Sequence, residues 1–189
     1  MDSTISDKDF SSITHQELIE LGRFYEECVF RNCIWIETDL SSMTFIDCQF
    51  IDCDLTMSMV TNTALQSINF ANCKMMGVRF HACKSFLLEM SFESCKMDFS
   101  SFQGLKGQGL KFNQCSLVEA DFINADLRNV QLTDCNLEGA QFENTLLDFA
   151  NLTDSVGIDL DPEINFVKGV KVSMSSLPGL LTKYQLNIQ

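Results

Sequence analysis

A five-residue period runs through most of this chain. Every fifth residue from Phe30 to Phe80 is apolar, the residue two positions before it is mostly small, and the others are mostly polar. Neither an α-helix, with 3.6 residues per turn, nor a strand, with a side-chain period of two, produces this spacing. The chain must therefore turn a corner every five residues, with two side chains of each five pointing inward.

A second series follows in a shifted phase. It runs in steps of five from Leu87 to Leu152, and Gly107 is its only member that is not apolar. Its small partners run from Ser85 to Ala150. The phase shifts by two residues within 81–86, which predicts a small bulge on one face of the coil.

Four sides of five residues close a square, so one coil has about twenty residues and stacks on the next at about 4.8 Å. About six such coils make a rod roughly 30 Å long. We therefore predict an all-β solenoid over 28–160, with an N-terminal cap or irregular first coil at 1–27. Residues 161–189 are expected to form a C-terminal capping helix and tail, with the helix over 176–184.

Several repeats resemble a known family. The matching segments are Ala120-Asp121-Phe122, Ala125-Asp126-Leu127, Cys135-Asn136-Leu137 and Ala150-Asn151-Leu152. They are similar to the A(D/N)LXX signature of pentapeptide-repeat proteins, and the resemblance covers about residues 28 to 155. It implies the right-handed quadrilateral β-helix of that family, whereas the spacing alone predicts coil size and inward positions but not handedness.

All nine cysteines occupy the small inward position. Because several are twenty residues apart, they are expected to stack in columns and to behave as small hydrophobes. Parallel side chains in a column cannot converge on one ion, so we expect no metal site and no other cofactor. Stacked pairs could oxidise, but a cytosolic compartment opposes disulfides. The cysteines are Cys28, Cys33, Cys48, Cys53, Cys73, Cys83, Cys95, Cys115 and Cys135.

Enzyme chemistry is not indicated. The two histidines, His15 and His81, have no neighbouring arrangement that suggests a nucleophile, and the acids are spread along the outward positions. Residues Met1 to Asp9 are acidic and no apolar run follows them, so we expect no signal peptide. We therefore expect a non-enzymatic, cytoplasmic protein that does not bind membranes.

The formal charge of −13 is unevenly distributed. Residues 1–73 carry a net −9, residues 74–111 a net +3, residues 112–163 a net −10 and residues 164–189 a net +3. Such a chain repels nucleic acid, but regular rows of carboxylates on a rigid rod can imitate a phosphate backbone. A merely solvated surface is the alternative. The acids singled out are Asp121, Asp126, Asp134 and Asp154.

Function on a regular rod is expected where the regularity fails. One such place is the phase shift, and another is the glycine-rich stretch 104–111, in which Gly107 predicts a hole in the interior. Both lie within residues 74–111, the segment with a net charge of +3. The candidate partner-binding residues in these segments are His81, Lys84, Phe86, Gly104, Lys106, Gly107 and Gly109.

The tail carries apolar residues after the last repeat. A solenoid end exposes unpaired strand edges, and self-association through the tail would cover them. Capping within the monomer is the alternative. We predict a homodimer that depends on Leu177, Leu180, Leu181, Tyr184, Leu186 and Ile188.

The segment from Gly157 to Pro162, the stretch from Val167 to Lys171 and the leucine-rich end resemble the C-terminus of the Qnr, McbG and MfpA type. That resemblance implies a dimeric DNA mimic that protects bacterial type II topoisomerases. Projecting loops of the Qnr kind are not evident, which favours the immunity type.

The leading hypothesis is a protein that binds DNA gyrase or topoisomerase IV and protects it from a toxin or antibiotic. A structural or scaffolding protein is the alternative. Acids on one continuous face favour the first, and scattered acids favour the second.

Overall fold

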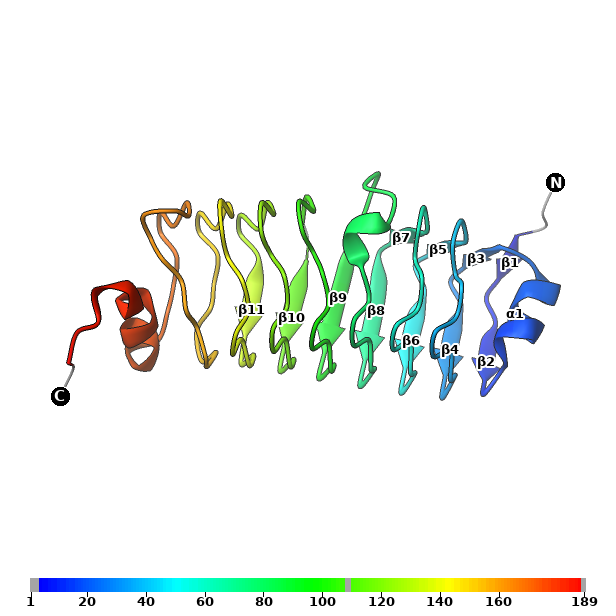
Figure 1. The fold of residues 1–189 in the computed structure, drawn as a ribbon. Coiled ribbons are helices and arrows are strands. Elements are labelled where there is room, and N and C mark those ends of the chain that lie inside the picture. Colours follow the sequence, from blue (N-terminus) through cyan, green and yellow to red (C-terminus); the bar gives the residue numbers. More distant parts are fainter. Residues whose placement is uncertain (1–3, 108–109, 188–189) are drawn as a thin grey trace.

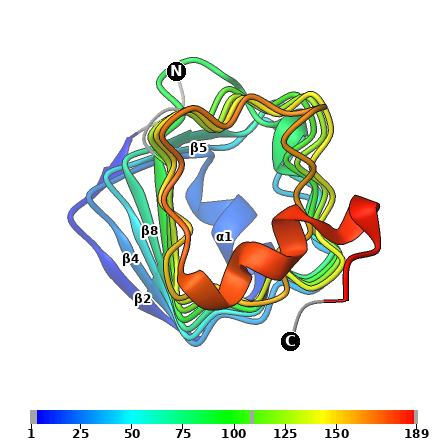
Figure 2. The same ribbon diagram turned by 90° about the vertical axis from the view of Figure 1, so that its left-hand side faces the viewer.

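Backbone pairing in this computed structural model joins residues about twenty apart. Phe30 lies opposite Phe50, and Phe50 opposite Phe70, in parallel register. The predicted all-β solenoid is thereby confirmed, and the chain winds as a right-handed quadrilateral β-helix that is a rod from the side (Figure 1) and nearly square from the end (Figure 2). The structure describes residues 4–107 and 110–187.

We number the four faces in chain order. Face 1, centred on Phe30, is a seven-stranded parallel sheet, and face 4, centred on Phe45, is a four-stranded one. On faces 2 and 3, centred on Trp35 and Leu40, successive coils are joined mainly by isolated parallel bridges. Face 1 comprises β2 (Asp9–Ser11), β4 (Val29–Arg31), β6 (Gln49–Ile51), β8 (Ile68–Ala71), β9 (Met90–Glu93), β10 (Lys111–Asn113) and β11 (Gln131–Thr133). Face 4 comprises β1 (Ile5–Ser6), β3 (Phe24–Glu26), β5 (Thr44–Ile46) and β7 (Ala64–Gln66).

The interior is a set of stacked columns. On face 1 the rings of Phe50 and Phe70 are 5.0 Å apart, and on face 3 those of Phe102 and Phe122 are 5.1 Å apart. Such ring pairs contribute about 0.5–1.5 kcal/mol each beyond the area that they bury. All nine cysteines are buried, as predicted.

The corners of the coil share one backbone conformation. The last residue of most sides has a positive φ, for example 51° at Asn32 and 55° at Asp52. This left-handed region is tolerated by asparagine, aspartate and glycine, which explains many of the residues found there. Each side thus has two inward positions fixed by packing and three outward positions that packing leaves free.

The chain accommodates the two extra residues of the phase shift at a different place from the one predicted. The chain keeps its register through a short 3₁₀ helix, η1 (Phe80–Ala82), to the buried Cys83. Leu88 then enters the interior, whereas Leu87 is 63% exposed and Ser85 is exposed too. The predicted inward positions of Leu87 and Ser85 are therefore wrong. An insertion can leave the coil at any point of a side, and here residues 84–87 bulge outward together.

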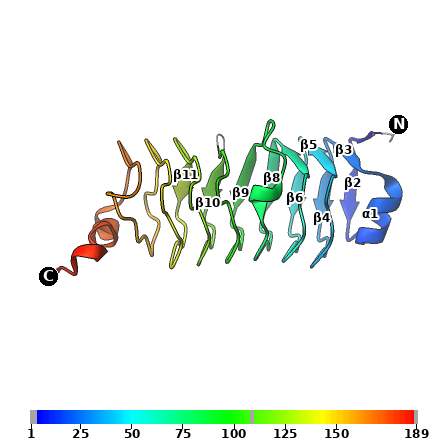
Figure 3. The same cartoon turned by 45° about the horizontal axis from the view of Figure 1, so that its top comes forward.

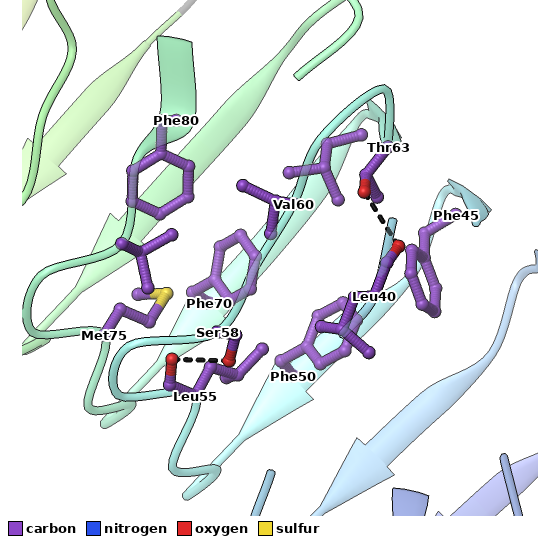
Figure 4. A pocket seen from close by; sticks show the side chains of 12 residues that line it. Leu40, Phe45, Phe50, Leu55, Ser58, Val60, Thr63, Phe70, Met75 and Phe80 are labelled. Carbon is purple, nitrogen blue, oxygen red and sulfur yellow. Dashed lines mark hydrogen bonds between the residues drawn. The ribbon is translucent and has the colours of Figure 1, made fainter. Parts of the chain in front are cut away.

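The predicted hole at Gly107 is also wrong. A Cβ at Gly107 would lie 2.8 Å from Cδ1 of Leu110 and 3.0 Å from Cδ2 of Leu127, so these side chains already fill the space. A small void of about 20 Å³ lies elsewhere in the interior, beside Val60, where the face-3 column contains a side chain smaller than Phe80 (Figure 4). Beside this void the hydroxyl of Ser58 donates a hydrogen bond to the carbonyl oxygen of Leu55 at 2.6 Å.

Parallel pairing extends beyond 28–160 in both directions. It begins at Ile5, opposite Tyr25, and continues to Lys171, which bridges Asn151. In the first coil α1 (His15–Leu21) replaces two sides, and a capping box between Thr14 and Glu17 begins it. At the other end two 3₁₀ helices, η2 (Met174–Leu180) and η3 (Thr182–Tyr184), stand in place of the single predicted helix (Figures 1 and 3).

Candidate protein-binding surfaces

The insertion at 84–87 is the most prominent irregularity of the rod. It projects from face 4 as a loop and presents Phe86, which is 73% exposed, beside Leu87 (Figures 1 and 2). An open groove of about 690 Å³ runs beside it, lined by residues that include Ile46, Gln66 and Lys106. The loop is therefore a larger feature than the small bulge predicted, and its apolar side chains face solvent.

Several of the predicted partner-binding residues gather at one edge, between faces 3 and 4. His81 and Lys84 lie one coil from Gly104 and Lys106, and Nδ1 of His81 is 3.0 Å from Oγ of Ser101. All four are exposed. Gly107 is buried, so it offers a partner no contact surface, and Gly109 lies outside the described residues.

The four predicted acids do not share a face. Asp134 and Asp154 occupy successive corners between faces 1 and 2, Asp121 lies on face 3, and Asp126 lies on face 4. Asp126 is paired with the guanidinium of Arg128 at 2.6 Å. That pairing lowers the pKa of Asp126 through a hydrogen bond from Arg128.

A larger acidic group lies along face 3 and its edge with face 2, in the C-terminal half of the rod. The three successive stretches that form it, 118–124, 138–144 and 158–164, contain no lysine or arginine. We call it the face-3 acidic patch. Of the acids in this patch, only Asp121 is among the partner-binding residues predicted from the sequence, although placing the chain on a twenty-residue coil brings all of them together. The patch comprises Glu119, Asp121, Glu138, Glu143, Asp159, Asp161 and Glu163.

Five N-terminal acids lie elsewhere. Asp7, Asp9, Glu26, Glu27 and Asp47 line the edge between faces 4 and 1, which is diagonally opposite the edge between faces 2 and 3. Asp9 is paired with Arg31 at 3.3 Å. Other N-terminal acids, Glu37 and Asp39 among them, lie on or beside face 3, so the acids of this zone are spread over several faces.

The tail covers part of the C-terminal end and leaves apolar side chains exposed. Leu180 is half-buried against the core, whereas Leu177, Leu181, Tyr184 and Leu186 are exposed. Ile188 lies outside the described residues.

A lysine clamps the tail to the last coil. Nζ of Lys183 lies 2.7 Å from carboxylate oxygens of both Asp161 and Glu163. These hydrogen bonds lower the pKa of Asp161 and of Glu163.

All nine cysteine side chains are free thiols buried in the interior. Across the described residues, histidine, cysteine, aspartate and glutamate do not cluster in any group suited to a metal ion. Burial raises the pKa of Cys48 and of Cys83 to about 12, so both remain protonated at neutral pH. Cys33, Cys53, Cys73, Cys95, Cys115 and Cys135 form one column that continues across the insertion, where the thiol of Cys95 donates to the carbonyl of Phe70.

Helices of bilayer-spanning length and apolar character do not occur in residues 4–107 and 110–187.

Two family models match the repeats. The model described as "Pentapeptide repeat region" matches residues 75–152, and that described as "Pentapeptide repeats (8 copies)" matches residues 26–56. The chain therefore belongs to the pentapeptide-repeat family. No curated protein matches the sequence.

Solved structures show the same fold. A trypsin-treated single-substitution form of QnrB1, described as a plasmid-mediated fluoroquinolone resistance protein, matches with a TM-score of 0.50 and 19% identity, over 98% of this chain and 97% of that one. A second trypsin-treated form of QnrB1, with a different substitution, matches with a TM-score of 0.51 and 19% identity, over 99% and 100%. HetL, a protein involved in heterocyst differentiation regulation from Nostoc sp. strain PCC 7120, matches with a TM-score of 0.41 and 15% identity, over 89% and 82%.

Proposed function

We propose that this protein is a DNA mimic that binds a bacterial type II topoisomerase, DNA gyrase or topoisomerase IV, and protects it from a toxin or antibiotic. The observation that carries the proposal is the face-3 acidic patch. The likeness in fold to QnrB1 over the full length of both chains supports it. The proposed partner works in the bacterial cytoplasm, and we place this protein there as well.

The charge density of the patch is close to that of DNA. Its seven carboxylates occupy three coils. At about 4.8 Å per coil they give about one charge per 2 Å of axis, against about 1.7 Å per charge in duplex DNA. A basic groove that receives DNA would therefore meet a similar field on a rigid rod, with Lys183 offsetting part of it.

A homodimer through the tail would extend this surface. The patch reaches the last coil, and the exposed Leu177, Leu181, Tyr184 and Leu186 lie just beyond it. If two copies meet at these side chains, their patches lie near the two-fold axis, and the acidic surface is doubled in length. Closed two-fold association is the commonest way for a chain to cover such an end.

The irregular edge between faces 3 and 4 is proposed to contact the enzyme beside the site of the toxin or drug. His81, Lys84, Gly104 and Lys106 supply polar contacts there, and the loop presents Phe86. Exposed aromatic side chains are common anchors in protein interfaces.

Binding to the enzymes tests the proposal. Purified protein would be used in a pull-down against the gyrase and topoisomerase IV subunits of its host. Supercoiling and cleavage would then be assayed with and without a quinolone or a gyrase-directed peptide toxin. We expect capture of one enzyme and reduced toxin-stabilised cleavage. If neither supercoiling nor cleavage changes, the proposal fails.

A structural or scaffolding role remains a second candidate, and one observation favours it. Five N-terminal acids, at the edge between faces 4 and 1, lie diagonally opposite the face-3 acidic patch, so a single monomer does not present all its acids to one partner. A scaffold would tolerate this arrangement, because its acids serve only solubility. Capture of proteins unrelated to topoisomerases, by the same surfaces, would favour this role.

A further inference from the structure

A second open groove lies halfway along the rod and crosses face 3 from its edge with face 2. It has a volume of about 340 Å³, and its lining includes Met57, Met59, Gly77, Arg79 and His81. It lies outside the face-3 acidic patch and the loop at 84–87. Apart from His81, it uses none of the residues proposed to contact the topoisomerase.

The rim of this groove is unusually apolar for an outer surface. Met57 is 55% exposed and Met59 is 52% exposed, and Phe99 occupies the corner two coils beyond Met57 and is 59% exposed. Met76 lies half-buried beside them. Clustered exposed apolar side chains mark binding surfaces more often than single ones do.

Met57 and Phe99 occupy corners whose backbone lies in the left-handed region. Met57 and Phe99 both have a positive φ, 59° and 61°, which costs free energy for bulky residues. Most other corners carry asparagine, aspartate, serine or glycine, which bear this conformation more easily. Because more than half of each side chain is exposed within the monomer, burial offsets this cost only in part, and a binding role would account for the choice of methionine and phenylalanine here.

Gly77 shapes the groove. It lies one coil beyond Met57 with a φ of 69°, and a Cβ there would come within 2.4 Å of Sδ of Met57. The absence of a side chain lets Met57 lie across the corner. Methionine is flexible and polarisable, so a groove walled by Met57 and Met59 can adapt to the shape of an apolar guest.

The lining of the groove carries a positive charge at one end. Arg79 is the charged residue in the lining, and no carboxylate lines it. The lysines on the adjoining face 2, Lys74 and Lys96, are each paired with an aspartate and add little net charge. Glu37 and Asp39 lie one coil from Met57 and Met59 on the N-terminal side, within the Debye length of about 8 Å at physiological salt, so the Arg79 end is the part of the groove that favours a carboxylate.

We propose that this groove binds a segment of a partner protein that combines large apolar side chains with carboxylates. The apolar groups would contact Met57, Met59 and Phe99, and a carboxylate would pair with Arg79. Nucleic acid is a poorer fit, because a groove with apolar walls and a single lining cation offers little to a row of phosphates.

The test is a selection of displayed random peptides on the intact protein, followed by titration of the enriched peptides as labelled synthetic probes. Met59→Glu and Arg79→Glu change exposed side chains in the groove, and Val156→Glu is the matched control, since Val156 is 60% exposed on face 2 near the C-terminal end. We expect enriched peptides rich in acidic and large apolar residues. Each groove variant should weaken them about ten-fold or more, and the control should not.

Four results would overturn the proposal. Selection could fail to enrich any peptide, or it could enrich basic peptides. Enriched peptides could also bind both groove variants as tightly as the unchanged protein, with circular dichroism showing that each variant is folded. Concentration-dependent self-association that Met59→Glu abolishes would assign the groove to a second copy of this chain instead.

Discussion

Phe99 and Phe102 are three residues apart in one coil, yet Phe99 is 59% exposed and Phe102 is fully buried. Phe102 stacks between Phe80 and Phe122, whereas Phe99 stands at a corner beside the methionine-lined groove. The inner positions of the coil determine that it folds, and the outer positions are free to vary. The same residue type therefore has a structural role at one position and is available for binding at the other.

The largest expected effect is the difference in unfolding free energy between substitutions at Phe102 and at Phe99. Phe102→Ala removes a ring from the middle of a column and should cost about 3–5 kcal/mol of unfolding free energy. Phe99→Ala should change it by less than about 0.5 kcal/mol, since an exposed side chain is lost. Urea unfolding measures both. Equal losses would contradict the division between inner and outer positions.

Much of the inner pattern was predictable from the sequence. The ten phenylalanines on the inward series and all nine cysteines are buried as the five-residue period requires. The period also continues to Ile5, Phe10 and Tyr25 at one end and to Val167 at the other. These signals were obscured because α1 and a proline-containing turn interrupt the series.

The outer surface was much harder to predict. A two-residue insertion can leave the coil at several points, and only packing decides that Leu88 rather than Leu87 enters the core. Likewise, sequence spacing does not show which residues before the insertion share a face with residues after it. The methionines of the groove precede the insertion and Phe99 follows it, so their proximity emerges only from the stacked coils. The acids of the face-3 acidic patch all follow the insertion and could have been grouped from their twenty-residue spacing.

In the tail, Leu180 packs inward whereas Leu177 faces solvent. Leu177→Asp should weaken the proposed dimer about 100-fold while the monomer stays folded, since such anchors contribute about 2–3 kcal/mol. Leu180→Asp should also dissociate it, but with loss of tail packing, because Leu180 contacts the core. Light scattering across a dilution series measures both. A monomeric unchanged protein, or a dimer indifferent to Leu177→Asp, would rule out this interface.

A smaller effect is expected where the interior is imperfectly filled. Val60→Ile adds one methylene toward the void of about 20 Å³. We expect a gain of about 0.5–1 kcal/mol in unfolding free energy, as for other cavity-filling changes. Val130→Ile, in a column without this void, is the control and should be neutral or destabilising. A loss at Val60 would mean that the surrounding side chains cannot accommodate the methylene.

The smallest effect concerns the clamp at Lys183. The pKa values of Asp161 and Glu163 are lowered from their usual 3.8 and 4.5, so this contribution is present above those values and is lost as pH falls through the lowered ones. Lys183→Met should lower the Tm by about 1–3 °C at pH 7, and the difference should shrink as the pH falls through the lowered pKa values. Thermal unfolding across a series of acidic pH values checks this. A difference that persists at low pH would assign the effect to packing of the lysine stem.

The most direct test of the account compares the two acidic surfaces while keeping their charge change equal. One variant carries Glu119→Gln, Asp121→Asn and Glu138→Gln in the face-3 acidic patch. The other carries Glu26→Gln, Glu27→Gln and Asp47→Asn at the opposite edge. The affinity of each for gyrase and topoisomerase IV would be measured at several salt concentrations. We predict that the face-3 variant loses about ten-fold or more in affinity and that the opposite-edge variant stays within about three-fold of the unchanged protein. Equal losses in the two variants, or no loss in either, would contradict the claim that one face of this rod imitates DNA.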